Sequence, residues 1–320
     1  MAARPARALP VRFECAPVPK RPGKRAADAE RVSYEQARKR CRISQRLVGM
    51  MAPLRAALDG AGGRAKKLVL SLDGSFSNRT VFLAPRDRTE IIARSRKDSL
   101  LCKADPTRSR RFYAVEKFRP EQVRRDEAIV WKTAKIFYGG KRRKIRYKEV
   151  NQVYWQGGAR RTPLRLLVVA PRPYRKRSSS KLYYRQPAYL LTTDLESKAR
   201  ELPRIYFDRW QIEVNHREEK DTLGVRQAQL WNQTAVPKQP VLAVAAYNVL
   251  LLASLLAYGP GHGESYAPLP KWRKRANRPS CLDLVALLRK EMAENPDLLA
   301  PPGLQPSFAG FAAAADGLNM

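Results

Sequence analysis

One short apolar run constrains the fold more than any other feature of the sequence. Residues 68–72 read Leu-Val-Leu-Ser-Leu and are followed at once by Asp73, Gly74 and Ser75. A continuous apolar run of this length, closed by turn-forming residues, is typical of a strand that is buried in a sheet. In α/β proteins the carboxyl ends of such strands carry the functional side chains. The sequence therefore predicts an α/β fold with Asp73 at the functional edge of its sheet.

The flanking segments divide the chain into four expected parts. A helical pattern runs from Ser33 to about Leu58, and residues 188–193 read as a second buried strand. The segment between them is rich in strand candidates, among them a hairpin around Gly139 and Gly140 and a strand at 164–170. We expect the first part of a main domain at 1–88, a mostly β, basic insertion at 89–187, the second part at 188–260, and a C-terminal helix with a loose tail at 261–320.

The charge balance indicates a polyanionic partner. The 320 residues include 63 Lys and Arg against 29 Asp and Glu, which gives a formal net charge of +34. Solubility alone needs only a few net charges on a small domain. Nucleic acid is the first candidate partner and an anionic membrane surface the second, because both attract dispersed Lys and Arg side chains.

Cysteine and histidine usage excludes several kinds of site. The four cysteines lie far apart without a CxxC pair, and the chain has only two histidines. This pattern argues against a zinc site and against a disulfide framework, so we expect a cytoplasmic protein. Any metal ion in such a chain would be held by carboxylates.

One apolar segment is long enough to cross a membrane. Residues 241–258 reach the required length, but the segment follows Pro240 and contains Asn248 and Ser254. We interpret it as a buried core helix and expect no membrane partner. The basic start of the chain leads into Pro and charged residues instead of an apolar stretch, so a signal peptide is not expected.

A polar helix is predicted between residues 206 and 220. On such a helix Tyr206, Arg209, Glu213 and Lys220 project within an arc of roughly 60°. One face thus presents a carboxylate between two cations and a phenol. The same pattern also fits a solvated ion-pair face, because Arg209 and Glu213 stand four residues apart. Spacing alone leaves these two interpretations open.

The spacing of these four residues resembles the signature of DDE transposases of the bacterial insertion-sequence type. In that family the Glu is the last of three metal-binding carboxylates. The segment from Asp73 to Thr80 is similar to the part of the family that carries its second catalytic Asp, and the similarity covers about residues 10–260. The resemblance implies an RNase H-like mixed sheet with flanking helices, interrupted by a mostly β insertion.

The resemblance also implies a chemistry and a set of partners. Asp73 and Glu213 would hold Mg²⁺, with Mn²⁺ as a substitute, for phosphodiester cleavage and strand transfer. Tyr206, Arg209 and Lys220 would contact double-stranded DNA at the transposon ends, and a dimer on the DNA is expected, bound to the nucleoid within the cytoplasm. The insertion is expected to bind the DNA backbone, chiefly through the residues at the start of its second hairpin strand, Lys141, Arg142 and Arg143.

The sequence departs from the family at the first catalytic Asp. Before Asp73 the chain offers only Asp28 and Asp59, and neither follows an apolar strand. Two accounts stay open: Asp194 is the third carboxylate, or the chain is an N-terminally truncated copy in which residues 9–14 form the third strand of the sheet. Truncation is the preferred account. A non-catalytic, basic DNA-binding remnant of a transposase is the alternative function.

Overall fold

The computed structural model describes residues 8–13, 18–107, 111–138, 141–176, 179–225, 227, 229–232, 234–258 and 280–296. The chain divides into two compact units. The first comprises residues 1–7 and 15–211, and the second comprises residues 8–14 and 212–320. Each unit is described by itself.

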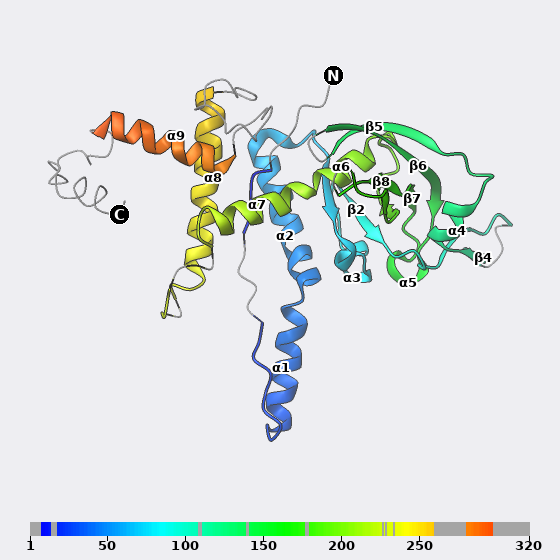
Figure 1. Cartoon of the computed structure of the whole chain (residues 1–320). Helices are drawn as coiled ribbons and strands as arrows, with labels where there is room; N and C mark the ends of the chain where they lie inside the picture. The colour runs from blue at the N-terminus through cyan, green and yellow to red at the C-terminus, as the bar shows by residue number, and fades with distance from the viewer. Residues whose placement is uncertain are drawn as a thin grey trace. The chain divides into compact units, whose positions relative to one another are not determined.

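The first unit is built around a mixed sheet of six strands in the order β1-β2-β10-β7-β6-β5. Strands β1 and β2 are parallel, and every other neighbouring pair is antiparallel. Figure 1 shows this sheet curling around the side of the unit that carries β5 and β6. The strands are β1 (Leu68–Leu72), β2 (Thr89–Ser95), β5 (Lys132–Tyr138), β6 (Lys141–Val153), β7 (Leu164–Val169) and β10 (Ala188–Thr192).

Helices and apolar side chains cover both faces of this sheet. On one face α2 (Ile43–Leu58), α3 (Arg79–Phe82), α4 (Pro120–Arg125) and α5 (Gln156–Ala159) pack against side chains such as Ile91 and Leu166. On the other face α6 (Leu202–Asp208) packs against Ile92, Leu167 and the β5–β6 hairpin. Neighbouring residues of β2 and β7 serve opposite faces because side chains alternate along a strand. The first unit is therefore a mixed α/β unit, as the two buried runs predict.

The segment expected to be an insertion is part of the sheet. Strands β2, β5, β6 and β7 all come from residues 89–187 and lie in one sheet with β1 and β10. Only the short hairpins β3–β4 (Leu101–Ala104 and Tyr113–Phe118) and β8–β9 (Arg172–Tyr174 and Tyr183–Arg185) lie outside it. The structure thus differs from the expected boundaries at residues 88 and 187, because apolar strands from this segment extend the sheet from β2 and β10.

The expected N-terminal helix also needs revision. The helix expected from Ser33 to Leu58 is two helices, α1 (Asp28–Arg40) and α2, with a break after Arg40. The glycine-rich run after α2 continues the chain as a π-type turn, Asp59–Gly63, before the strand begins. Gly62 has a φ of 80°, which a residue without a Cβ adopts freely. Figure 1 shows α1 directed away from the sheet of its unit, and α1 has no buried residue.

The second unit contains most of α7 (Trp210–Asp221), from Ile212 onward, together with α8 (Lys238–Tyr258) and α9 (Cys281–Glu294). A buried network joins them: the Tyr247 hydroxyl donates to the Glu218 carboxylate at 2.6 Å and lies 3.1 Å from the side-chain oxygen of Asn215. The backbone amide of Cys281 donates to the other Glu218 oxygen at 3.4 Å. The helix expected near residues 282–295 is confirmed as α9, and the rest of the expected tail, 261–279 and 297–320, lies outside the described residues.

Residues 8–13 and α8 differ from their expected roles. Residues 8–13 form no strand, and the side chains of Asn215 and Asn248 donate to the carbonyls of Ala8 and Pro10. Among the described residues, Lys238–Leu256 alone is long and apolar enough to cross a membrane by length and composition, but only 17% of its apolar window is buried. It buries one stripe, Val244, Tyr247 and Leu251, and is not a fully buried core helix.

Candidate functional site

Asp73 directly follows β1 and turns back onto the loop that comes after it. Its Oδ1 accepts a hydrogen bond from the Ser75 backbone amide at 2.8 Å and another from the Ser75 hydroxyl at 2.6 Å. Burial raises the pKa of Asp73, but these hydrogen bonds and the positive charge of Arg209 outweigh it and leave the pKa below its usual value. Asp73 is therefore a carboxylate at neutral pH, as a metal ligand must be.

The structure brings Tyr206 and Arg209 to this carboxylate. Tyr206 is buried in α6, and the Arg209 guanidinium lies 5.9 Å from the centre of its ring. Burial raises the pKa of Tyr206, while Arg209 and Arg94 lower it and Asp73 raises it further. These four side chains thus feel one another's charge on the α6 side of β1. The expected role of Tyr206 and Arg209 in contacting DNA stays a prediction.

Glu213 and Lys220 belong to the second unit, both on α7 and both exposed. The helix expected over residues 206–220 is interrupted at Arg209, between α6 and α7. Because the two units are each defined separately, the expected pairing of Asp73 with Glu213 stays a prediction, and so does the single face shared by all four signature residues.

Asp194 lies at the opposite end of the sheet from Asp73. It is fully buried, and it accepts hydrogen bonds from the amide and hydroxyl of Ser197 and from Lys67 at 3.4 Å. Lys67 immediately precedes β1 and Asp73 immediately follows it, so Lys67 and Asp73 lie about 20 Å apart along a strand that rises about 3.3 Å per residue. Asp194, which contacts Lys67, therefore lies at the far end of β1 from Asp73. Asp194 holds the turn after β10 and is not the third carboxylate of a site at Asp73, because such sites hold their metal ions about 4 Å apart.

The basic residues expected to bind DNA start strand β6. Arg142 and Arg143 are exposed there, opposite Phe137 and Ile136 of β5. The side chain of Lys141 lies outside the described part of the chain, as do Gly139 and Gly140 of the expected turn. The pairing of β5 with β6 confirms the hairpin, and a role of its cations in DNA binding stays a prediction.

A cavity of about 1070 Å³ opens beside Gly74, at the Asp73 end of the sheet. The carboxyl end of β2, the start of β10, the residue after β7, and α4 contribute to its walls. Two acids line it, Asp98 and Glu121, against six cations, so its lining carries four excess positive charges. The cations are Arg94, Arg96, Lys97, Arg119, Arg124 and Arg125.

Both acids of this cavity orient its arginines. Arg96 binds Asp98 through two nitrogens, at 3.0 and 2.8 Å. Glu121 accepts hydrogen bonds from Arg124 at 2.6 Å and from Arg125 at 2.9 Å, which hold its pKa well below the usual range despite partial burial. Three of the five arginines are thus oriented by carboxylates, and a guanidinium fork is the donor geometry that suits phosphate oxygens.

Sequence reasoning missed this cavity. Its cations come from two separate segments, 94–97 and 119–125, and only the fold joins them. One signal was available: from residue 150 to residue 193 the sequence contains no Asp or Glu, and this stretch supplies the remaining rim. A long segment without acids beside arginine-rich strand ends predicts a positively charged surface.

The described residues contain no group of three or more His, Cys, Asp or Glu side chains that could hold a metal ion. Asp73 has the chemistry of a Mg²⁺ ligand, but Arg209 supplies a competing positive charge beside it. Within the described part of the first unit, Asp73 is thus a single carboxylate at this cluster. A site for Mg²⁺ at Asp73 needs carboxylates from outside this cluster, Glu213 being the expected one.

Comparison with models of known protein families gives no match, and comparison with curated proteins gives none either. The resemblance to DDE transposases therefore rests on the motif residues themselves.

Proposed function

We propose that this chain binds double-stranded DNA at insertion-sequence ends, as a protein of the DDE transposase type. One observation carries the proposal: the arginine-lined cavity opens at the same end of the sheet as Asp73, Tyr206 and Arg209. A nucleic-acid backbone bound along the cavity would pass beside the carboxylate. The net charge of +34 supports the same partner, because phosphate neutralisation releases counterions.

An RNase H-like arrangement is part of this proposal. The parallel pair β1 and β2, with Asp73 at the carboxyl end of β1 and α3 between the strands, supports it. Antiparallel strands continue the sheet beyond β2. These features lie on the β2 side of β1, which is itself an edge strand of the sheet.

The chemistry proposed for the site is metal-dependent phosphodiester cleavage and strand transfer. Asp73 and Glu213 would hold Mg²⁺, or Mn²⁺ in its place, and the bound ions supply activation of the attacking oxygen and stabilisation of the leaving oxygen. Arg209 would orient a phosphate through its fork of donors, and its guanidinium packs over the ring of Tyr206. Lys220 would add a point charge to the phosphate contacts. We further propose that two copies act together on the DNA.

A non-catalytic, DNA-binding function is the second candidate. It is favoured by the cavity at the Asp73 end of the sheet, where six cations stand against two acids. This candidate needs the cavity and the surface cations but not the metal ligands. The two candidates therefore predict the same binding and different cleavage.

Binding is tested first, with a short fluorescent duplex titrated at about 50 to 200 mM salt. Neutralising the exposed cavity cations in the double variant Lys97→Gln, Arg119→Gln should reduce the slope of log affinity against log salt by about two. The matched control removes two exposed cations of α1, with Lys39→Gln and Arg40→Gln. A slope that both variants change equally, or an affinity that does not respond to salt, would contradict the proposed interface.

Cleavage is tested next, with labelled insertion-sequence ends in Mg²⁺ and in Mn²⁺. Cleavage that Asp73→Ala and Glu213→Ala both abolish, with DNA affinity unchanged, supports the transposase. DNA binding without cleavage supports the second candidate. Cleavage that survives both substitutions would refute the assignment of Asp73 and Glu213.

A further inference from the structure

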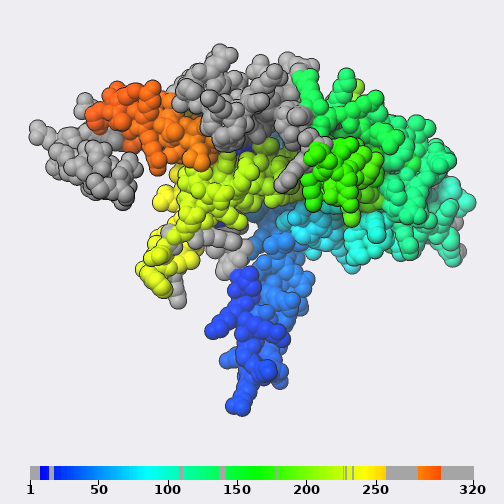
Figure 2. Space-filling model, in the orientation of Figure 1, coloured from blue at the N-terminus to red at the C-terminus, as the bar shows by residue number. Residues whose placement is uncertain are grey.

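The β8–β9 hairpin is an entirely basic ribbon. Residues 171–187 include six Lys and Arg residues and no acid. The hairpin connects β7 to β10, and the antiparallel pairing of Ala188 with Val169 places its base at the end of the sheet where Asp73 lies. Figure 2 shows this part of the chain, in bright green, at the surface that faces the viewer.

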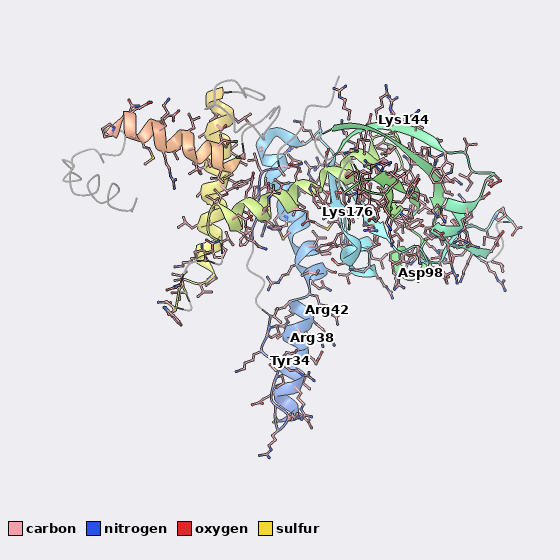
Figure 3. All side chains as sticks on the ribbon, viewed as in Figure 1. Tyr34, Arg38, Arg42, Asp98, Lys144 and Lys176 are labelled. Atoms are coloured by element: carbon pink, nitrogen blue, oxygen red, sulfur yellow. The ribbon has the colours of Figure 1, made fainter. Side chains whose placement is uncertain are left out.

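Aromatic rings hold the cations of this ribbon in place. Tyr174 and Tyr183 face each other across the two strands with ring centroids 5.6 Å apart. Arg185 lies 5.2 Å from the Tyr174 ring, and Lys176 and Lys181 lie 5.2 and 5.4 Å from the Tyr183 ring. Each such contact favours one position of a long, otherwise mobile side chain. The contacts thus give the cationic side chains of the ribbon preferred positions on one face (Lys176 is labelled in Figure 3).

The opposite face of the ribbon is exposed. Tyr184 pairs with Pro173 there and is 64% exposed. The ribbon therefore offers a hydrogen-bonding phenol on one face and ordered cations on the other. Both faces are open to a partner that approaches along the length of the hairpin.

The base of the ribbon forms part of the wall of the arginine-lined cavity. Pro171, Gln186 and Pro187 flank the two strands and line the cavity together with Arg96 and Arg119. The residues that join the ribbon to the cavity are thus uncharged, and no acid lies between them and the cations of the ribbon. The basic ribbon and the cation-rich cavity adjoin at the Asp73 end of the first unit.

We propose that the β8–β9 ribbon inserts into the major groove of double-stranded DNA and guides the adjoining phosphate backbone into the cavity. This proposal rests on the proposed DNA-binding function and assigns the element that enters the groove. The major groove, about 12 Å wide, admits a two-stranded ribbon, whereas the minor groove of about 6 Å does not admit one that carries aromatic side chains. Arg175, Lys176 and Lys181 would reach the phosphates, and Tyr184 the base edges.

The test uses the full chain with Arg175, Lys176 and Lys181 all changed to Gln. The control variant changes Lys39 and Arg40 at the end of α1, and Arg42 just before α2, to Gln, removing the same net charge from another exposed part of the first unit. Three lost phosphate contacts should lower the salt slope by about three, which corresponds to as much as about 500-fold weaker duplex binding near 0.1 M salt. The α1 variant should lose much less, and equal unfolding temperatures would establish that both variants fold.

Equal losses in the two variants would overturn the ribbon proposal, because binding would then follow net charge alone. The groove is tested by competition: methyl green, a major-groove ligand, should displace the protein, and netropsin, a minor-groove ligand, should not. The reverse result would refute major-groove insertion. Tighter binding of single strands that depends on Tyr184 would show a stacking site instead of a groove reader. If the unmodified chain binds no DNA, the proposed function itself is refuted. If the ribbon variant binds the duplex with unchanged affinity, only this assignment of the ribbon is refuted.

Discussion

A buried lysine holds the helix that supplies part of the cavity wall. Lys148 of β6 is 1% exposed, and its ammonium group donates hydrogen bonds to the carbonyls of Val123 at 3.2 Å and Arg124 at 3.0 Å, and to that of Asp126. The final carbonyls of a helix need partners outside it, and a cation suits that end of the helix dipole. We predict that Lys148→Met destabilises the first unit by about 3 kcal/mol.

The magnitude follows from two opposing effects. A hydrogen bond to a charged group contributes about 1.5–3 kcal/mol, so three of them sum to more than 4 kcal/mol. Methionine regains part of this, because an ammonium group no longer has to be kept out of water and the carbonyls at a short helix end can turn toward solvent. For a unit of about 200 residues, 1 kcal/mol shifts the melting temperature by about 2–4 °C, which gives an expected fall of about 6–12 °C.

Thermal and urea unfolding, followed by tryptophan fluorescence, measures this effect. Trp131 is a reporter of the right region, since the Lys148 ammonium lies 4.8 Å from its ring. The matched control is Lys144→Met, an exposed position on the same strand that should change stability by less than about 0.5 kcal/mol. Equal stability of the two variants would refute the reasoning, because it would mean that the three carbonyls find other partners without cost.

Three further changes test the site and its surroundings. Arg209→Gln should raise the pKa of Asp73, which carboxyl-carbon NMR titration measures. Because the pKa of Asp73 is lowered in the folded state, its ionised carboxylate stabilises the fold above the ordinary pKa of 3.8, and this stabilisation is lost as the pH falls through the lowered pKa. Acid unfolding should therefore show a smaller stabilisation by Asp73 in the variant than in the original chain. Gly158→Ala should cost about 1–3 kcal/mol, since its Cβ would lie 2.2 Å from an indole ring, whereas Gly157→Ala, 4.0 Å from that ring, should cost much less in thermal unfolding. Asp194→Ala should lower stability by about 3 kcal/mol in urea unfolding with DNA affinity unchanged; weaker DNA binding at full stability would instead place it in the interface.

Local sequence patterns predicted individual elements of the fold well. The runs at 68–72, 164–170 and 188–193 each contain a strand. Each run is short, apolar and bounded by turn residues, and these three properties can be read from the run and its immediate neighbours. The pairing of these strands carries no comparable local signal. Residues 89–187 therefore read as a separate β insertion, although their longest strands complete the sheet.

The candidate site was predictable to the same extent. Motif spacing singled out Asp73, Tyr206 and Arg209, and in the structure the charge of Arg209 acts on both of the other two side chains. The cavity did not follow, because its cations are single residues at the ends of β2 and α4 whose proximity depends on Tyr189 and Glu121 meeting across 68 positions of sequence. Spacing within one helix is a local property, and convergence of several chain segments is not.

The direction of β10 decides how the rest of the functional surface is organised. Because β10 runs antiparallel to both β2 and β7, its first residues lie at the Asp73 end and its last residues at the opposite end. This direction brings Tyr189 and the basic ribbon before it to the cavity, and it carries Asp194 away to Lys67. Had β10 been parallel to β2, Asp194 would lie beside Asp73 and the ribbon would lie far from both. The direction of this one strand thus separates Asp194, which holds a turn, from the positively charged cavity, and no residue of the strand itself reveals that direction.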